Sequence, residues 1–386
     1  MTQTSRTFRA PGAAAPRLAD LTTLRVGGPA GSFVEATTEA ELVEVVREAD
    51  EAGTPLLVLG GGSNLLVADA GFDGMVVRDV RRGIDATADS ACAGANLVVP
   101  AGQDWDEVVA TAVNEGWMGV EALSGIPGST GATPVQNVGA YGQEVAETLA
   151  SVRVYDRLER RVRMLAVGEL GLGYRTSVLK RSRTEPDDGG GRTWQPSGRY
   201  VVLEVAFQMR LASLSAPVRY AELARRLDVP IDSRVPATEV REAVLALRRG
   251  KGMVLDAGDH DTWSAGSFFT NPILPAEDAD RLLPQDAPRF PVTDHRRLAQ
   301  EGGSAPAAEG LVKTSAAWLI TRAGFDKGYG APGPASLSTK HALALTNRGQ
   351  ATAADLLALA RTVRDGVRDV FGVTLEPEPV LVGAEL

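Results

Sequence analysis

The sequence predicts an α+β protein of more than one domain, and three observations support this. Short apolar runs alternate with amphipathic stretches in the first third of the chain, strand-like runs follow between residues 150 and 211, and a long helical pattern lies near the end. At 386 residues, the chain exceeds the size at which one hydrophobic core usually keeps growing. We therefore expect two or three domains that combine strands with helices.

The opening unit is predicted to be a strand, a helix and a second strand. SFVEA at 32–36 has a strand pattern, and Thr38 and Glu41 have the spacing of a helix capping box. Apolar residues then recur at helical spacing, at Leu42, Val45, Val46 and Ala49. Gly53 and Pro55 end this helix, and LLVL at 56–59 is typical of a buried strand.

A second unit of the same kind follows, with a strand at 96–102 and a helix at 104–116. Residues 122–145 are too rich in glycine and proline for a regular helix or a central strand. Strands are then predicted at 150–157, 161–167 and 200–211, and the composition of residues 182–199 is that of a long mobile loop.

The last third of the chain is predicted to form another domain. A helical pattern covers 237–250, and a loop-rich segment leads to KTSAAWLITRAG at 313–324. The final helix is the clearest, since Thr352 and Asp355 can cap it and Gly372 ends it. Its apolar stripe consists of Leu356, Leu359, Ala360, Val363, Val367 and Phe371.

Composition excludes some classes of partner. The 40 Lys and Arg against 49 Asp and Glu give a net charge of −9, the opposite of what attracts nucleic acid. No apolar run approaches the roughly 20 residues needed to cross a bilayer. We expect a soluble protein that binds no nucleic acid and does not insert into a membrane.

The start of the chain lacks the apolar segment of a secretory signal, and residues 1–20 are predicted to be a disordered tail. With one cysteine, Cys92, no intramolecular disulfide can form, which fits a reducing compartment. We expect a cytoplasmic monomer.

The glycines of LLVLGGGSNLLVAD at 56–69 indicate a possible phosphate site. A glycine-rich turn can point several backbone N–H groups into one concavity that suits a diphosphate, although a simple tight turn is equally compatible with three glycines. The spacing differs from the G-x-G-x-x-G dinucleotide fingerprint, because these glycines are contiguous and NLLV resembles a strand. A second glycine-rich segment at 124–132 favours a phosphate site, since two loops can clamp one diphosphate.

Several long motifs carry a resemblance to a known family. TLRVGGPA, LLVLGGGSNLLVADAGFDGMVV, LSGIPGSTGATPVQNVGAYGQEV, LGYRTSVLK, SAGSFFTNP and LEPEPVLVG occur between Leu21 and Gly383. In this order they resemble the UDP-N-acetylenolpyruvoylglucosamine reductases of peptidoglycan precursor synthesis, in the subclass with a tyrosine-bearing loop.

The resemblance implies non-covalent FAD in a fold of the vanillyl-alcohol oxidase/PCMH type, with a separate α+β substrate-binding domain. NADPH would reduce the flavin, which would then reduce UDP-N-acetylglucosamine enolpyruvate to UDP-N-acetylmuramate. The corresponding division is an FAD-binding subdomain at 21–75, a second at 76–215, a substrate-binding domain at 216–350, and a helix and strand at 351–386 that return to the active site.

The resemblance also implies three catalytic residues. Arg175 of GYRTS matches the arginine that binds the substrate carboxylate, and Ser267 of GSFF matches the serine that protonates the intermediate. Glu378 of LEPEP matches the carboxylate that assists the enolate, and Glu376 is the competing local candidate. Where the family often has a basic residue two positions past this glutamate, the chain has Val380.

The cofactor-binding residues implied by the two glycine-rich motifs are Gly60, Gly61, Gly62, Ser63, Asn64, Ser124, Gly125, Ile126, Pro127, Gly128, Gly131, Ala132, Gln136, Asn137, Gly139, Ala140 and Tyr141. The implied substrate-binding residues are Tyr220, Lys251 and Asn271. Without the resemblance, Lys251 and its arginine neighbours would be interpreted as a solvated helix end.

No metal site is predicted, because His260, His295 and His341 are dispersed and lack ligand spacing. Cys92 is more typical of a small buried hydrophobic residue than of a nucleophile. Two alternatives stay open at this point: an FAD-dependent oxidase of an alcohol or sugar, and a non-catalytic protein that binds flavin or a UDP-sugar.

Overall fold

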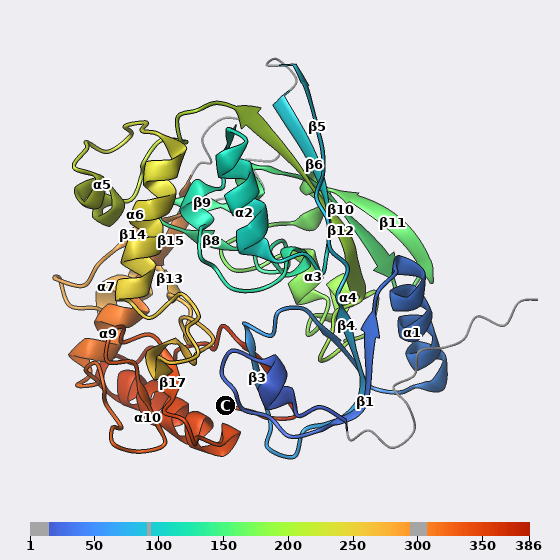
Figure 1. Ribbon diagram of the computed structural model, residues 1–386. Helices are drawn as coiled ribbons and strands as arrows, with labels where there is room; N and C mark the ends of the chain where they lie inside the picture. Colours follow the sequence, from blue (N-terminus) through green and yellow to red (C-terminus); the bar gives the residue numbers. More distant parts are fainter. Residues whose placement is uncertain (1–14, 91–93, 294–306) are drawn as a thin grey trace, which may run out of the picture.

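The computed structural model describes residues 15–90, 94–293 and 307–386 (Figure 1). Its first sheet is parallel, in the order β1 (Ala30–Ala36), β4 (Phe72–Asp79), β2 (Leu56–Leu59). Helix α1 (Glu39–Ala52) has the predicted capping box at Thr38. Leu42 and Val46 of α1 are fully buried, in one core with β2, β4 and Val201 of the second sheet.

The second sheet is antiparallel, in the order β11 (Arg161–Ala166), β10 (Leu149–Asp156), β12 (Tyr200–Leu211), β6 (Gly94–Pro100), β5 (Asp85–Ser90). Strand β7 (Trp117–Met118) pairs with the end of β12. Burial alternates along β12, as expected for a strand with one face in the core. Helix α2 (Trp105–Asn114) begins at the N-cap Asp104, and its buried face joins the same core.

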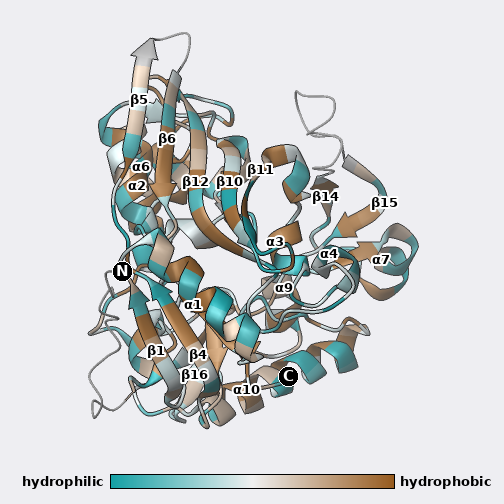
Figure 2. Ribbon diagram, turned by 90° about the vertical axis from the view of Figure 1, so that its right-hand side faces the viewer, coloured by the Kyte–Doolittle hydropathy of each residue, from teal (hydrophilic) through white to brown (hydrophobic). Residues whose placement is uncertain are grey.

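The rest of the chain forms a group of helices and small sheets (Figure 1). Helices α5 (Ala221–Leu227) and α6 (Ala237–Gly250) share a core. A larger core joins α9 (Ala316–Arg322) and α10 (Ala353–Phe371). The small elements are β13 (Ile273–Pro275), α7 (Ala276–Leu282), β14 (Phe290–Thr293), β15 (Ala307–Lys313), β16 (Ala335–Leu337) and β17 (Leu345–Asn347). Figure 2 shows α1 and α10 with both polar and apolar residues, as amphipathic helices require.

The C-terminal strand returns to the first part of the molecule. Strand β18 (Val380–Val382) pairs in parallel with β3 (Leu65–Val67), directly after the first glycine loop. Phe269 also forms a bridge with Pro377. Segments about 315 residues apart in sequence (β3 and β18) and about 110 residues apart (Phe269 and Pro377) are thus fixed beside one another.

The structure corrects three expectations. Residues 1–14 of the predicted tail lie outside the described residues, but Leu18 is fully buried in a 3-10 helix, Leu18–Leu21. The predicted division after residue 75 would cut β4. Residues 182–199 are not an open loop: α3 (Val178–Arg181) leads into a turn and α4 (Pro186–Gly189), and Trp194 is buried.

The remaining predictions of secondary structure are confirmed. Helix α10 has the Thr352–Asp355 capping box and ends at Gly372, which is left-handed with φ +69°. The strands expected near 150–157, 161–167 and 200–211 are β10, β11 and β12. None of the helices in the described residues has the length and apolar character required to traverse a bilayer.

Candidate active site

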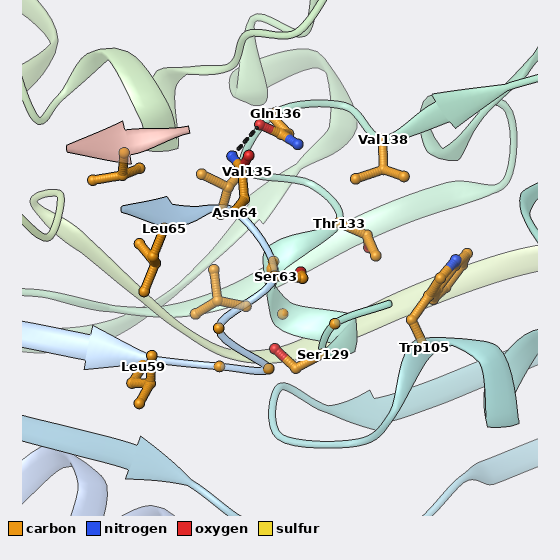
Figure 3. Close-up of a pocket in the computed structure, with 18 of the residues that line it drawn as sticks. Leu59, Ser63, Asn64, Leu65, Trp105, Ser129, Thr133, Val135, Gln136 and Val138 are labelled. Atoms are coloured by element: carbon orange, nitrogen blue, oxygen red, sulfur yellow. Dashed lines mark hydrogen bonds between the residues drawn. The ribbon is translucent and has the colours of Figure 1, made fainter. Parts of the chain in front are cut away.

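A cavity of about 340 Å³ lies where the two glycine-rich loops, the segment 265–267 and the return strand meet. Figure 3 shows Ser63 and Asn64 from the first loop together with Ser129 and Gln136 from the second. Of the predicted cofactor-binding residues, those that line the cavity are Gly60, Gly61, Gly62, Ser63, Asn64, Ile126, Pro127, Gly128, Gly131, Ala132, Gln136 and Gly139.

The glycines of the first loop are required by its close contacts. A Cβ on Gly60 would lie 2.2 Å from Ser129 Oγ, and one on Gly61 would lie 2.6 Å from the Cα of Gly128. Gly62 has φ +63°, and its Cβ would lie 1.9 Å from the carbonyl oxygen of Leu21. Gly60 and Gly61 therefore allow the two loops to approach each other, and Gly62 allows the first loop to pack against Leu21.

Hydrogen bonds connect the first loop to the return strand. The Asn64 side chain donates to Gln136 Oε1 at 2.9 Å (Figure 3) and to the backbone carbonyl of Glu378 at 3.3 Å. Gln136 Nε2 donates to Glu378 Oε1 at 3.4 Å. These contacts fix the Glu378 side chain relative to the glycine loop.

Arg175 and Glu378 form an ion pair in the cavity wall, with 3.1 Å between Arg175 Nε and Glu378 Oε1. Arg175 lies in a turn closed by Gly173 and Thr176 and has φ +55°, a conformation rare for arginine. Lys180 Nζ donates to the carbonyl oxygen of Arg175 at 3.0 Å, and Arg175 Nη2 donates to Gly139 O at 3.0 Å. Lys180 thus fixes the backbone of Arg175, and Gly139 and Glu378 fix its guanidinium.

Ser267 lies on the same cavity, in a segment paired with that of Glu378. The Phe268 N–H donates to Leu343 O, and the Glu378 N–H donates to Phe268 O, both at 2.8 Å. Within the described part of the chain, the Ser267 hydroxyl has no hydrogen-bond partner. Glu376, the competing candidate, is exposed.

Buried hydrogen-bond donors without acceptors concentrate at this cavity. Among the described residues, Trp105 Nε1, Arg175 Nε and Arg248 Nε are buried and unsatisfied, and all three residues line it; Trp263 Nε1 is also unsatisfied. The Arg175 N–H is within ion-pair distance of Glu378 but is not directed at its oxygen. Since buried donors are normally paired, the cavity suits a ligand with several acceptor atoms.

Arg248 adds positive charge beside Pro127 and Gly266. Burial lowers its pKa to about 10, and Tyr141 and Asp106 oppose this shift. Arg248 Nη2 donates to the carbonyl oxygen of Met253 at 2.9 Å.

The other predicted cofactor-binding residues are not among the lining residues. Ser124 is buried and donates to Glu121 O, and the Gly125 N–H donates to Asp106 Oδ1. Asn137 is buried and bonds Glu144 and Gly173. Ala140 and Tyr141 belong to the small hairpin of β8 (Gly139–Ala140) and β9 (Gln143–Glu144). Their cofactor contacts stay predictions.

The predicted substrate residues lie near the cavity but outside its lining. The ring of Tyr141 packs edge-on against exposed Tyr220, with 5.6 Å between ring centroids. Lys251 lies 5.6 Å from the centre of the Tyr141 ring and pairs with Glu222 at 2.5 Å. Asn271 adjoins Tyr174, the neighbour of Arg175, through a long 3.4 Å bond to the Tyr174 hydroxyl.

Groups of His, Cys, Asp and Glu that could hold a metal ion are absent from the described ranges. His260 packs against Trp263, with 4.4 Å between ring centroids, and His341 is partly buried. Cys92 and His295 lie outside the described residues.

Sequence reasoning missed several lining residues, among them Trp105 and Arg183. The sequence predicts only the first turn of a helix for Trp105 and a mobile loop for Arg183. The density of Arg and Lys in KRSR, directly after LGYRTSVL, was the available signal for Arg183.

Comparisons with known proteins agree with this geometry. A family model described as FAD binding domain matches residues 30–164, and one described as the C-terminal domain of UDP-N-acetylenolpyruvoylglucosamine reductase matches residues 258–382. A relative of that name from Saccharopolyspora erythraea is 57% identical over 372 residues, covering 96% of this chain and 95% of its own. The chain belongs to the UDP-N-acetylenolpyruvoylglucosamine reductase family.

Other members of the UDP-N-acetylenolpyruvoylglucosamine reductase family give the same result. The relative from Cutibacterium acnes is 53% identical and covers 96% of this chain and 90% of its own. The crystal structure of the reductase from Thermus caldophilus has a TM-score of 0.60 at 25% identity, covering 95% of this chain and 97% of its own. The predicted α+β class with an FAD-binding fold is confirmed, and FAD is the cofactor of the protein.

Proposed function

We propose that this chain catalyses the NADPH-dependent, FAD-mediated reduction of UDP-N-acetylglucosamine enolpyruvate to UDP-N-acetylmuramate, a step of peptidoglycan precursor synthesis. The observation that carries the proposal is the convergence of Arg175, Glu378 and Ser267 on one cavity in a member of this family. Bound FAD supplies the hydride chemistry, because it can accept a hydride from NADPH and donate one to the enolpyruvyl β carbon.

Arg175 is proposed to bind the substrate carboxylate. A hydride that adds to the β carbon pushes the alkene electrons toward the carboxylate, which then carries enolate charge. A fixed guanidinium stabilises that charge without reorganising. The bond of Arg175 Nη2 to Gly139 O and the ion pair with Glu378 preorganise the group, and Lys180 fixes the Arg175 backbone.

Glu378 is proposed to act on the same carboxylate as a neutral acid. Its Oε1 lies within reach of both Gln136 and Arg175. A proton on Glu378 would change it from the partner of Arg175 into a hydrogen-bond donor, and the guanidinium would then be free to bind the substrate anion.

Ser267 is proposed to protonate the α carbon. Its proton moves to the carbanion-like centre, and water returns a proton to the serine oxygen, so the substrate gains one hydride and one proton in total. A hydroxyl is a weak acid, but an enolate beside it is a strong enough base. The absence of a competing protein partner for the Ser267 hydroxyl within the described chain supports this role.

Lys251 and Tyr220 are proposed to hold the sugar-nucleotide diphosphate, with Asn271 nearby. Lys251 forms an ion pair with Glu222, so a diphosphate must displace the Glu222 carboxylate to bind Lys251. A monomeric state and a cytoplasmic location stay predictions of the sequence.

An anaerobic flavin assay tests the function. The purified protein is reduced with one equivalent of NADPH, and UDP-N-acetylglucosamine enolpyruvate is then added without oxygen. We expect the flavin absorbance to return as UDP-N-acetylmuramate forms. A flavin that is reduced but is not reoxidised by this compound would refute the substrate assignment.

A further inference from the structure

The segment 182–199 places an arginine in the cofactor cavity, although sequence reasoning assigned it no role. Arg183 lines the cavity together with Pro196, Ser197 and Gly198. It donates through Nε to the carbonyl oxygen of Pro196 at 2.9 Å. Within the described chain, Arg183 has no ion pair.

Three other arginines around the same segment differ from Arg183 because each has a carboxylate partner. Arg157 pairs with Asp50 at 2.6 Å, Arg181 with Asp188 at 2.6 Å, and Arg199 with Asp156 at 2.7 Å. Burial lowers the pKa of Arg183, and no carboxylate counteracts the shift. A guanidinium kept partly buried and unpaired, when carboxylates serve its neighbours, is suited to an anion that is not part of the protein.

The segment is a built part of the cavity wall. Trp194 is buried, donates to Gly189 O at 2.8 Å, and stacks with the guanidinium of Arg192 at 3.5 Å. Ser197 Oγ accepts a hydrogen bond from the backbone N–H of Val58 at 2.7 Å. This contact connects the segment to β2, just before the first glycine loop.

The contacts of the first glycine loop distinguish the two ends of the cavity. Val58, at its start, bonds Ser197, whereas Asn64, at its end, bonds Gln136 and the backbone of Glu378. The glycines lie between these two contacts. If the flavin ring lies beside Glu378 and the diphosphate lies along the glycines, the adenosine half of FAD lies beside residues 183 and 197.

We propose that Arg183 binds the phosphate on the adenosine side of FAD. The guanidinium can form two parallel hydrogen bonds to phosphate oxygens, and Nε already bonds Pro196, so the terminal nitrogens are the available donors. The proposal rests on FAD occupying this cavity and is independent of which substrate the enzyme reduces. It gives Arg183 the function of holding the cofactor, with Pro196, Ser197 and Gly198 beside it in the cavity wall.

Equilibrium binding of FAD to the apoprotein tests the proposal. Arg183→Gln should raise the Kd for FAD about tenfold or more, since a charge-assisted bond is lost. Arg192→Gln, with the same charge change on the same segment, should leave the Kd unchanged. The Kd of Arg183→Lys for FAD should lie between those of Arg183→Gln and the wild type, because lysine keeps the positive charge but cannot form two parallel hydrogen bonds.

Two further ligands separate this role from others. ADP should also bind more weakly to Arg183→Gln, whereas FMN, which lacks the adenosine half, should bind as well as it does to the wild type. Melting of each apoprotein serves as the control for folding. Equal FAD affinity for the Gln variants of Arg183 and Arg192 would overturn the proposal, and so would an equal loss of FMN and FAD binding. The reductase assay can fail without changing these affinities, so the two proposals are tested separately.

Discussion

The two ends of the cavity differ in how the positive charge of an arginine is balanced. At one end Arg175 has a carboxylate partner, Glu378, 3.1 Å away. At the other end Arg183 contacts a backbone carbonyl, and none of the described carboxylates pairs with it. Both side chains are partly buried, so the difference lies in what neutralises the charge. Among the described residues, a carboxylate balances the charge of Arg175 and none balances the charge of Arg183.

This difference corresponds to two tasks. A cofactor that stays bound can balance an arginine permanently, so a protein carboxylate there would only compete with it. A substrate that arrives and leaves in each turnover requires a site that is stable when empty, and an internal acid provides that stability. The catalytic end should therefore control rate and the far end should control cofactor retention.

The largest effect is expected for Ser267→Ala, at the catalytic end. The rate of reoxidation of the reduced enzyme by substrate should fall about 10²- to 10⁴-fold, the usual contribution of general acid catalysis. Reduction of the flavin by NADPH should continue at the wild-type rate, and stopped-flow absorbance measures both steps. An equal loss in both steps would show that the hydroxyl positions the flavin instead of donating a proton.

Arg175→Ala should lower the same reoxidation rate about 10²- to 10³-fold, because a preorganised positive charge is lost where charge develops. Arg175→Lys should recover only part of the reoxidation rate, since an ammonium lacks the planar pair of N–H donors with which a guanidinium binds a carboxylate. The exposed Arg192→Ala serves as the control. A Kd for FAD that rises with the loss of Arg175 would contradict the division of tasks between the two ends.

Lys180→Met should have a smaller effect, a loss of about tenfold in the reoxidation rate, because the Arg175 backbone loses a charge-assisted hydrogen bond. Burial lowers the pKa of Lys180. In the wild type, the rate should therefore decline with rising pH before the ordinary lysine range, as the ammonium is lost. The variant should lack this alkaline decline; a pH profile parallel to that of the wild type would exclude the positioning role.

The smallest effect is a change in the free energy of unfolding with pH, caused by His341. Burial lowers the pKa of His341 to about 4, with Lys251 and Lys327 adding to the shift and Glu222 opposing it. The unfolded chain takes up a proton near pH 6.5 and the folded chain only near 4, so stability should fall as pH falls through this window.

Allowing for partial exposure, the loss is on the order of 1–2 kcal/mol. Urea unfolding at several pH values measures it, with His341→Gln as the comparison. The variant should have a flatter dependence; the same slope in both proteins would assign the pH effect to other groups.

Local patterns predicted much of the fold. The capping box at Thr38, the strand at 56–59 and the stripe of α10 each depend on residues that are close in sequence. Residues 182–199 could not be predicted in this way, because their order depends on contacts of Ser197 with β2 and of Arg199 with β10. A polar, glycine-rich composition indicates a loop equally well when distant partners fix it.

The candidate site was predicted through the motifs and not through residue chemistry. Ser267 alone resembles a turn hydroxyl, and only the pairing of its segment with that of Glu378 shows why it belongs to the cavity. Arg183, in contrast, belongs to none of the motifs, and its role could not be predicted from the sequence. Cations (Lys180, Arg181) precede it and acids (Glu185, Asp187, Asp188) follow it closely in sequence, so the absence of a carboxylate partner among the described residues is evident only in three dimensions.

A crossed measurement on two variants tests the account most directly. For Arg175→Ala and Arg183→Gln, we would measure both the Kd for FAD and the reoxidation rate by substrate at saturating FAD. We expect the Arg175 variant to keep its FAD affinity and lose reoxidation rate, and the Arg183 variant to lose FAD affinity and keep its rate. If each substitution lowered both quantities to a similar extent, the two ends would not have separate tasks and the central claim would be wrong.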